Sequence, residues 1–270
     1  MYRLQEKLRD KKPAMGMLTK GGPNLVRHLA AGGLDFIIAD MMHGRMDWDE
    51  AAHITWVARA EGLYPFVRIQ GHPWGTSSNL LDRRFVVDGM KAFTLGAEGV
   101  MWSITSAAEA EALAHLAADW HQGRPVTSVE ELEAMEESNR ATRMLIPLIE
   151  SRGAIDALDD ILAIDGISGV FMAMTDLSHQ LGHPHEYDHP EVVAALEHSA
   201  ELAEKHGKTI LANTGYTYPT PQGQADHATR LFQHGANMVM LQTTEYYQYV
   251  ITKTVVDGVL ENLGNESGKS

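Results

Sequence analysis

The sequence has 270 residues, of which 44% are hydrophobic and 21% are charged, which is enough for one large domain with a substantial core. Lysine and arginine number 22 against 36 aspartates and glutamates, so the formal net charge is −14, and such a negative field repels phosphate backbones and anionic membranes. There is no cysteine, which excludes disulfides, thiolate catalysis and cysteine-ligated zinc. We therefore expect no nucleic-acid partner.

The sequence also gives no sign of membrane insertion or secretion. No apolar run approaches the about 20 residues that a membrane helix needs. The N-terminal stretch MYRLQEKLRDKKPAMG is charged but has no apolar segment typical of a secretion signal. We therefore expect a cytoplasmic protein that does not associate with membranes.

Short apolar runs typical of strands recur along the chain, with helical patterns between them. Eight runs are found, at residues 14–18, 35–40, 64–69, 97–102, 144–150, 168–174, 208–214 and 236–242. Runs that are apolar throughout suit parallel strands covered on both faces. The pattern predicts an α/β fold with a single (β/α)8 TIM barrel domain over residues 1–262 and a flexible tail at 263–270. An open doubly wound sheet is the alternative, but no G-x-G-x-x-G motif follows the first run.

Two of the connecting segments carry clear helix signals. Segment 49–60 opens with acids and is followed by Gly62, and segment 189–207 has Pro190 in its first turn and ends at Gly207. These residues are typical of helix starts and stops. Segment 120–143 is longer than a minimal connection and acidic in its middle, and it is expected to form a helix and a loop on one rim.

Polar residues directly after the apolar runs are the candidate site, because active sites of such barrels lie at the carboxyl ends of the strands. Asp40 and His43 follow the second run, and Arg68 belongs to the third. Glu150 ends the fifth run, and Asp176 lies just past the sixth. Four strands therefore deliver an acid and imidazole pair, a guanidinium and two further carboxylates to one rim.

Each candidate also has a structural explanation. Asp40 would serve as the cap of the following loop or helix, and Arg68 as the partner of a neighbouring acid. Glu150 would cap the helix that begins around Gly153, and Asp176 suits a turn. Their coincidence at equivalent positions of the barrel favours the functional interpretation.

These residue types suit one kind of chemistry. Two carboxylates without cysteine or a three-histidine set favour a divalent cation with oxygen ligands, Mg²⁺ or Mn²⁺ first, with Co²⁺ or Zn²⁺ as alternatives. Arg68 offers a planar fork for a carboxylate or a developing enolate. His43 is able to move a proton near neutral pH, with Asp40 as a candidate to orient it.

The loop GHPHEYDHPE is a second, weaker metal candidate. It contains His183, His185 and His189, but their spacing fits neither a helical H-x-x-x-H face nor a strong zinc pattern. We favour the interpretation of a surface loop that leads into a helix.

The ordered set of motifs resembles the HpcH/HpaI aldolase family, the metal-dependent class II pyruvate aldolases of the phosphoenolpyruvate/pyruvate barrel group. The pattern of Glu150 followed by Ala-Ile, with Asp176-Leu177-Ser178 about 26 residues after it, is the strongest match. The resemblance extends over most of the chain, through GGLDFIIADMMHG, PFVRI, LGAEGVM, LIPLIESRGAI, IDGISGVFMAMTDLSHQLG and HPEVVAALE.

The resemblance implies roles for individual residues. Glu150 and Asp176 would ligate the divalent metal, to which a pyruvate-like 2-oxo acid would bind through its carboxylate and keto oxygens. Arg68 would hold the keto or enolate oxygen, His43 would take part in proton transfer, and the backbone N–H of Thr175 would meet the substrate carboxylate. The resemblance also implies a homohexamer in which a C-terminal helix is exchanged between neighbouring subunits.

Three positions depart from the family pattern. Met42 stands directly before His43 where the family usually has an acid, and Leu148 replaces a glutamine two residues before Glu150. Thr94 replaces an aspartate that commonly helps orient the histidine. These departures affect the expected proton relay, whereas the metal pair and the arginine are intact.

An apparent insertion of roughly ten residues lies at 75–90, and its Asp82 or Asp88 is a candidate for the missing acid. This insertion, segment 120–143 and the loop TGYTYPTPQG are expected to shape the pocket for the second substrate.

The predicted activity is that of an aldolase, a carbon–carbon lyase that forms or cleaves 4-hydroxy-2-oxo acids through a metal-bound pyruvate enolate and an aldehyde. Two alternatives remain. One is a citrate-lyase-β-like acyl-CoA lyase, although the charge of −14 disfavours coenzyme A. The other is a degenerate barrel that binds metal and oxo acid without catalysis, as the changes at Met42 and Thr94 would allow.

Overall fold

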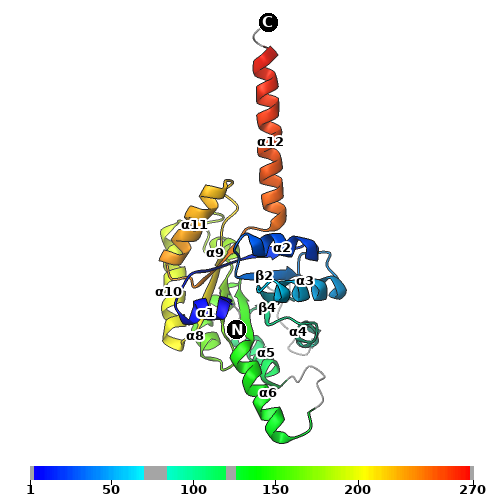
Figure 1. Ribbon diagram of the computed structural model, residues 1–270. Coiled ribbons are helices and arrows are strands. Elements are labelled where there is room, and N and C mark those ends of the chain that lie inside the picture. Colours follow the sequence, from blue (N-terminus) through cyan, green and yellow to red (C-terminus); the bar gives the residue numbers. More distant parts are fainter. Residues whose placement is uncertain (1–2, 70–83, 120–125, 268–270) are drawn as a thin grey trace.

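The computed structural model describes residues 3–69, 84–119 and 126–267. Eight parallel strands form a closed barrel in which each strand pairs with the next and the eighth pairs with the first. Figure 1 shows helices packed around this barrel, so the predicted TIM barrel is confirmed. The strands are β1 (Ala14–Thr19), β2 (Phe36–Asp40), β3 (Tyr64–Arg68), β4 (Gly99–Ile104), β5 (Met144–Ile149), β6 (Gly169–Met172), β7 (Thr209–Asn213) and β8 (Met238–Leu241).

Helices alternate with the strands, and their ends follow the local sequence. The side chain of Asp47 accepts a hydrogen bond from the N–H of Glu50 at the start of α3, and Gly207 ends α10 with a left-handed φ of 65°, as expected for such caps. The helices are α1 (Arg3–Arg9), α2 (Pro23–Ala31), α3 (Trp48–Ala60), α4 (Arg84–Thr94), α5 (Ala107–Asp119), α6 (Val129–Thr142), α7 (Arg152–Asp156), α8 (Leu158–Ala163), α9 (Met174–Gln180), α10 (Pro190–His206), α11 (Pro221–Gln233) and α12 (Thr244–Ser267).

The barrel is filled by a cluster of large apolar side chains that face its interior. Phe36 and Phe66 meet edge to face at 5.7 Å between ring centroids. Their rings fit because Gly16 and Gly99 face them, and a Cβ at either glycine would lie 2.2 Å from a ring carbon. Leu4 of α1 belongs to the same cluster and is fully buried. A second cluster packs the outer faces of the strands against the helices, which explains why the strands are apolar on both faces.

Several expected element boundaries differ from the structure. The sixth strand ends at Met172 rather than at residue 174, and the eighth begins at Met238 rather than at residue 236. The fourth strand begins at Gly99 rather than at residue 97, because Ala97 still bonds back to the carbonyl of Ala92 in the preceding turn. The expected tail at 263–270 is helical as far as Ser267, where α12 ends; a long helix extends one residue at a time at little cost once it has formed. The helix expected within 120–143 is α6.

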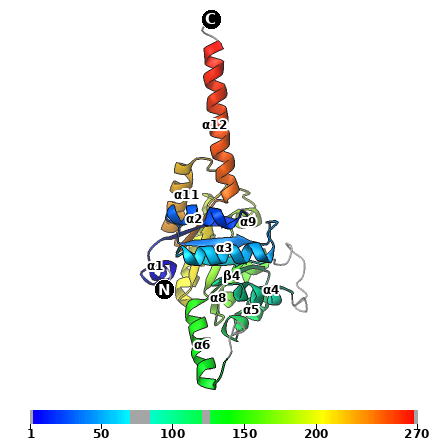
Figure 2. The same cartoon turned by 45° about the vertical axis from the view of Figure 1, so that its right-hand side comes forward.

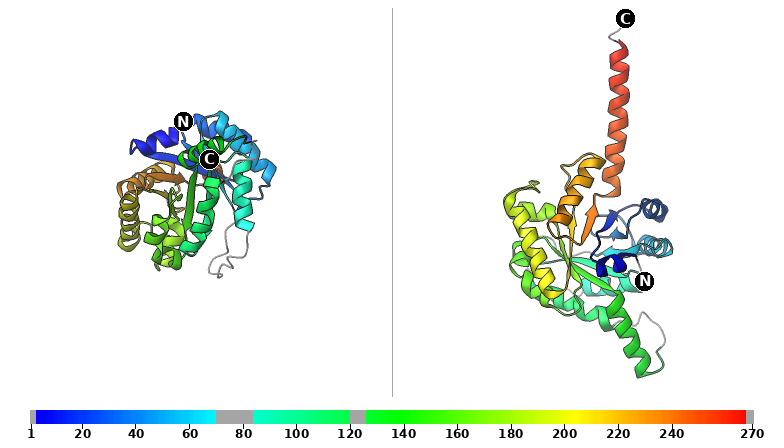
Figure 3. Two further views of the ribbon diagram at one scale, coloured as in Figure 1. Left: turned by 90° about the horizontal axis from the view of Figure 1, so that it is seen from below. Right: turned by 60° about the vertical axis from the view of Figure 1, so that its left-hand side comes forward.

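The helix α12 extends away from the barrel along much of its length (Figures 1 and 2). The right-hand view of Figure 3 shows that the outer part of α12 extends beyond the other elements. Its exposed apolar side chains are Tyr249, Ile251, Val255, Val256, Val259 and Leu260. Within the described residues, no helix combines the length and apolar character needed to cross a membrane.

Candidate active site

A buried ion pair joins the ends of two neighbouring strands. Asp40 and Arg68 are register partners at the ends of β2 and β3. Arg68 donates from Nε to Oδ1 of Asp40 at 2.9 Å and from Nη2 to Oδ2 at 2.8 Å. Burial alone would raise the pKa of Asp40, but the hydrogen bond and charge of Arg68 lower it below its ordinary value, helped by backbone N–H groups. The carboxylate is therefore ionised at neutral pH.

The loop after β2 places His43 beside this pair. The N–H groups of Met42 and His43 donate to Oδ1 of Asp40 at 3.1 and 3.3 Å, an arrangement typical of an acid that fixes a turn. Gly44 completes the turn, because a Cβ there would lie 2.4 Å from the carbonyl oxygen of Asp40. Asp40 therefore holds the His43 backbone in place, as well as the guanidinium.

The environment of His43 favours its neutral form. His43 is exposed as a whole, but partial desolvation of its ring lowers the pKa of the imidazole most. The charges of Arg68 and Lys20 lower it further, while Asp40 and Glu150 act in the opposite direction. The net pKa lies below the ordinary value. A neutral imidazole is the form that accepts a proton.

Two carboxylates lie on the facing side of the site. Glu150 follows β5, and Asp176 lies in the first turn of α9 after β6. Burial raises the pKa of both, and the charge of Asp176 raises that of Glu150 further. Glu150 and Asp176 are half-buried, and carboxylates that repel each other in such a place lack compensating positive charge, which is the condition that a bound cation relieves.

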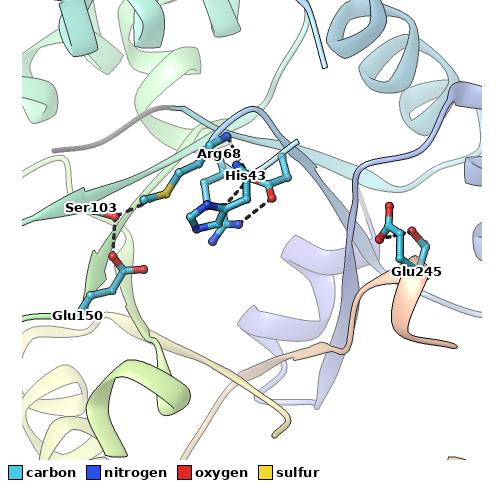
Figure 4. A network of polar contacts seen from close by, with 8 residues as sticks. His43, Arg68, Ser103, Glu150 and Glu245 are labelled. Atoms are coloured by element: carbon cyan, nitrogen blue, oxygen red, sulfur yellow. Dashed lines mark hydrogen bonds and ion pairs between the residues drawn. The ribbon is translucent and has the colours of Figure 1, made fainter. Parts of the chain in front are cut away.

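Ser103, at the end of β4, contacts Glu150 directly. Its hydroxyl donates to Oε2 of Glu150 at 2.6 Å, and its oxygen lies 3.9 Å from the sulfur of Met42. Figure 4 shows His43 beside Arg68 and, across the site, Ser103 bonded to Glu150. Met42, which stands where the family usually has an acid, therefore packs against the residue that holds Glu150.

The wall next to Asp176 is built by the first turn of α9. Asn213 of β7 accepts the N–H of Met174 at 2.8 Å, which fixes the start of this helix. The hydroxyl groups of Thr175 and Tyr187 lie 3.3 Å apart. The N–H of Thr175 belongs to the first helical turn, whose N–H groups have no partner within the helix, so it suits the expected contact with a substrate carboxylate.

The structure thus brings together the strand-end residues singled out in the sequence, and it also shows some of their structural alternatives. Arg68 pairs with a neighbouring acid, and Asp40 stabilises its loop. Glu150 does not cap the next helix, since the side chain of Ser151 accepts the N–H of Ala154 at the start of α7.

Asp40 contacts the backbone of His43 rather than its ring. Within the described part of the chain, its carboxylate bonds to the Arg68 guanidinium and to backbone N–H groups, and no hydrogen bond joins it to the His43 ring. Asp40 acts on His43 through its charge and through the loop backbone. The family's acid–imidazole dyad is therefore not formed here by Asp40.

Two of the positions considered for the missing acid belong to one helix. Thr94 is the last residue of α4, and a barrel helix ends at the rim where the next strand begins, so Thr94 lies at the opposite end from His43. Asp88 lies within α4. Asp82 lies outside the described residues.

The sequence analysis missed three polar residues at this rim. Lys20 follows β1, Ser103 lies next to the last residue of β4, and Tyr216 follows β7. Burial raises the pKa of Tyr216 most, and the charges of Arg68 and Asp176 also act on it. The rule applied to the other strands, that polar residues at strand ends form the site, would have identified all three.

One hollow of the described surface lies away from this site. It has a volume of about 780 Å³ and is bordered by residues such as Leu8, Lys11, Gly207 and Asn237, which lie at the ends where strands begin. The candidate active site is instead identified by the convergence of charged side chains at the other ends of the strands.

Comparison with known proteins agrees with this geometry. The model of the family described as HpcH/HpaI aldolase/citrate lyase matches residues 17–244. The chain belongs to this family. A hydroxypyruvate/pyruvate aldolase from Rhizorhabdus wittichii is 30% identical over 210 residues, which cover 74% of this chain and 78% of the relative. A 5-keto-4-deoxy-D-glucarate aldolase from Enterobacter sp. (strain 638) is 37% identical over 103 residues, 38% of this chain and 37% of the relative.

Solved structures of HpcH/HpaI proteins share the fold. An HpcH/HpaI aldolase from Desulfitobacterium hafniense DCB-2 superposes with a TM-score of 0.77 at 23% identity, covering 96% of this chain and 97% of the other. The citrate synthase SbnG gives a TM-score of 0.76 at 23% identity, with 96% and 98% of the two chains covered. At these identities the likeness extends to the barrel alone, because one barrel carries many chemistries.

Proposed function

We propose that this HpcH/HpaI family protein is a divalent-metal-dependent aldolase that forms or cleaves 4-hydroxy-2-oxo acids, with a pyruvate-like oxo acid and an aldehyde as partners. The observation that carries the proposal is the facing arrangement of Glu150 and Asp176 with Arg68 and His43. It combines two carboxylates able to hold a cation, a guanidinium able to donate hydrogen bonds to an oxyanion, and a neutral imidazole able to accept a proton. The aldolase names of the relatives support the substrate class.

The donor set of Glu150 and Asp176 fits a divalent cation. Two carboxylates offer the oxygen ligands that Mg²⁺ and Mn²⁺ prefer, and they leave positions for water or substrate oxygens. Their raised pKa values, caused first by burial, show that the site is short of positive charge. When bound, the ion would polarise the oxo acid and favour loss of a methyl proton.

Arg68 is positioned to stabilise the negative charge that develops on the keto oxygen. Its Nε and Nη2 donate hydrogen bonds to Asp40, so Nη1 is the nitrogen that is positioned to donate to a substrate oxygen. The buried ion pair fixes the guanidinium before substrate arrives, and such fixed donors need no reorganisation during the reaction.

His43 is the proposed base for the C3 proton of the oxo acid, and it would return a proton in the cleavage direction. Its lowered pKa keeps the imidazole neutral at the pH at which it must accept a proton. Asp40 is a positioning residue, because it fixes the His43 backbone and the Arg68 side chain at once.

The pKa of His43 gives a prediction for the pH dependence of activity. Because the folded-state pKa is lowered, the imidazole stays neutral until the pH falls below about 6.5, and activity is lost only below that value. The decisive measurement is the rate of methyl-proton exchange against pH at saturating metal, which keeps protonation of Glu150 and Asp176 from dominating. A midpoint above the ordinary histidine value would contradict this role.

Ser103 gives a second prediction, about cation affinity. Residues that orient a metal ligand typically contribute 10–100-fold to affinity, so Ser103→Ala should weaken Mn²⁺ binding by about that factor. Ser103→Thr keeps the hydroxyl and should restore most of it. Calorimetric titration with Mn²⁺ tests both. Ser199→Ala is the matched control, because Ser199 is also buried but donates to the carbonyl of Ala195 within its own helix.

We further propose that the chain forms a homo-oligomer, a hexamer by family resemblance, through α12. Val255 and Val259 lie one turn apart on its exposed face, with 60% and 51% of their surface exposed, and apolar stripes of this kind mark interfaces. Cytoplasmic location stays a prediction from the sequence.

Charges on this stripe should break the assembly. Val255→Asp and Val259→Asp bury an unpaired charge in the proposed interface, which is strongly unfavourable, so the mass in solution measured by light scattering should fall toward that of one chain. Val129→Asp is the control, because Val129 is 65% exposed on α6. An unchanged mass in both α12 variants would exclude this interface.

The function is tested by product analysis. The purified protein is incubated with pyruvate, Mg²⁺ and a set of short aldehydes, and 4-hydroxy-2-oxo acids are measured by mass spectrometry. Formation of these products that chelation abolishes supports the proposal. Cleavage of a hydroxyacyl-coenzyme A ester in place of condensation would favour the acyl-CoA lyase, and binding without either reaction would favour the degenerate barrel.

A further inference from the structure

The loop between α9 and α10 brings together side-chain atoms able to ligate a metal ion, which the spacing of these residues in the sequence did not indicate. The N–H of Glu186 bonds to the carbonyl of His183, and the N–H of His189 bonds to the carbonyl of Glu186, both at 3.0 Å. Two consecutive turns therefore place every third side chain on the same side. One ligand atom from each of His183, Glu186 and His189 lies within 4.8 Å of the others.

We propose that His183, Glu186 and His189 form a second metal site, for a transition metal ion such as Zn²⁺, separate from the Glu150–Asp176 site. Two imidazoles and one carboxylate are a common protein ligand set for Zn²⁺ and leave a fourth position for water. Mg²⁺ and Mn²⁺ prefer oxygen ligands, so the two sites differ in the ion that they select.

A neighbouring carboxylate supports this assignment. Nε2 of His183 lies 2.9 Å from Oε2 of Glu191. Metal-ligating histidines commonly donate their second ring nitrogen to a carboxylate in this way, and the bond fixes the tautomer and the ring orientation.

Ion binding requires a small rearrangement of the two rings. His183 and His189 are stacked, with ring centroids 3.4 Å apart and planes 18° from parallel, so their in-plane lone pairs do not converge on one point. Rotation about the Cβ–Cγ bond of one ring brings them together, and this torsion is broad in histidine. His189 also accepts the N–H of Glu191 at 3.3 Å as the cap of α10, a contact worth about 1 kcal/mol at such positions.

The site would link two segments that border the active site. Tyr187 lies within the loop, is 2% exposed, and its hydroxyl lies 3.3 Å from that of Thr175. Its ring fills the space next to Gly215, where a Cβ would lie 2.1 Å from a ring carbon. An ion that ties His183 to His189 therefore stabilises the loop that holds Tyr187 in place, and it raises the resistance of the folded chain to heat.

Zn²⁺ titration of the full-length Glu150→Gln variant tests the proposal without contribution from the main site. In excess Mg²⁺, competition with a chromophoric chelator should detect one Zn²⁺ equivalent, and Zn²⁺ should raise the melting temperature. His183→Ala should remove that equivalent. His189→Asn should remove it too while keeping a good helix cap, so loss of binding cannot be assigned to misfolding of α10. Glu186→Gln should weaken it by at least about tenfold.

The matched control is His198→Ala, which removes another histidine of α10, paired with Glu201 at 3.9 Å. It should keep the full equivalent. Absence of Zn²⁺ binding in the Glu150→Gln background, or an equivalent that survives both His183→Ala and His189→Asn, overturns the proposal. Neither result bears on the aldolase function, whose own test uses Mg²⁺ and pyruvate.

Discussion

Glu150→Gln should abolish turnover at ordinary Mg²⁺ or Mn²⁺ concentrations while the barrel stays folded. The amide keeps the shape of the side chain but removes one of two anionic ligands, so mostly water would surround the ion. Calorimetric titration with Mn²⁺ should show affinity lowered by at least about a hundredfold, in line with the loss of a direct ligand rather than of an outer contact. Activity that survives both this change and exhaustive chelation would show that no metal is needed.

The same variant has a second expected signature in the metal-free protein. The folded-state pKa of Glu150 is raised, first by burial and then by Asp176, so its ionised form opposes folding at neutral pH, and this penalty disappears as the pH falls through the folded pKa. Glu150→Gln should therefore keep or raise the melting temperature in chelator at neutral pH. Glu109→Gln is the matched control: Glu109 is buried and accepts the N–H of Thr105 at 2.6 Å, so this change should lower stability and leave Mn²⁺ affinity unchanged.

Arg68→Lys should lower the rate by roughly 10²–10³, the usual cost of one oxyanion donor. Lysine keeps the charge but loses the planar fork that grips Asp40 through Nε and Nη2, and it cannot hold a donor at the position of Nη1. The measurement is the rate of methyl-proton exchange in pyruvate, which needs no aldehyde. Because the pair is buried, the variant should also be less stable, so the rate is measured well below its melting temperature.

A second bidentate pair provides the control for Arg68. Arg230 donates from Nε and Nη2 to Asp188 at 3.0 and 3.2 Å on the half-exposed surface. Arg230→Lys removes the same geometry away from the strand ends, so exchange should stay within a few-fold of the unchanged protein. If Arg68→Lys behaves like Arg230→Lys, the Arg68–Asp40 pair is a structural ion pair and has no part in the reaction.

Much of the fold could be predicted because the barrel strands are short and apolar on both faces. Their boundaries were less certain where a turn residue is itself apolar, as Ala97 is before β4. The helix α12 continues to Ser267 although glycine, asparagine and serine in its last turns have low helix propensity, because the preceding helix supports their conformation. Propensity read over a short window does not register that support.

The residues of the candidate site could be predicted from the sequence, but the contacts between them could be predicted only in part. Asp40, Arg68, Glu150 and Asp176 stand out because a buried strand has no structural need to end in a charge. Which acid faces which base depends on strand register, and the alignment of Asp40 with Arg68 directs the carboxylate to the guanidinium instead of to His43. Ser103 also follows an apolar run, so the same rule would have identified it, but its bond to Glu150 depends on the pairing of β4 with β5.

The histidine loop is a surface loop that leads into α10, as expected. Its spacing fits no helical pattern, so the sequence disfavoured a metal site. The structure forms two successive turns there, and such turns bring residues three apart onto one side. A helical template does not detect this arrangement.

Deuterium incorporation into the methyl group of pyruvate, followed by NMR in D₂O without any aldehyde, tests the central claim most directly. The protein should exchange the methyl protons with Mg²⁺ or Mn²⁺ present and stop when the metal is removed by chelation. His43→Ala should eliminate exchange while Mn²⁺ and pyruvate still bind, because His43 is the proposed base and is not one of the proposed metal ligands. Exchange that continues in chelator, or at full rate in His43→Ala, would contradict a metal-assisted enolisation in which this histidine takes the proton.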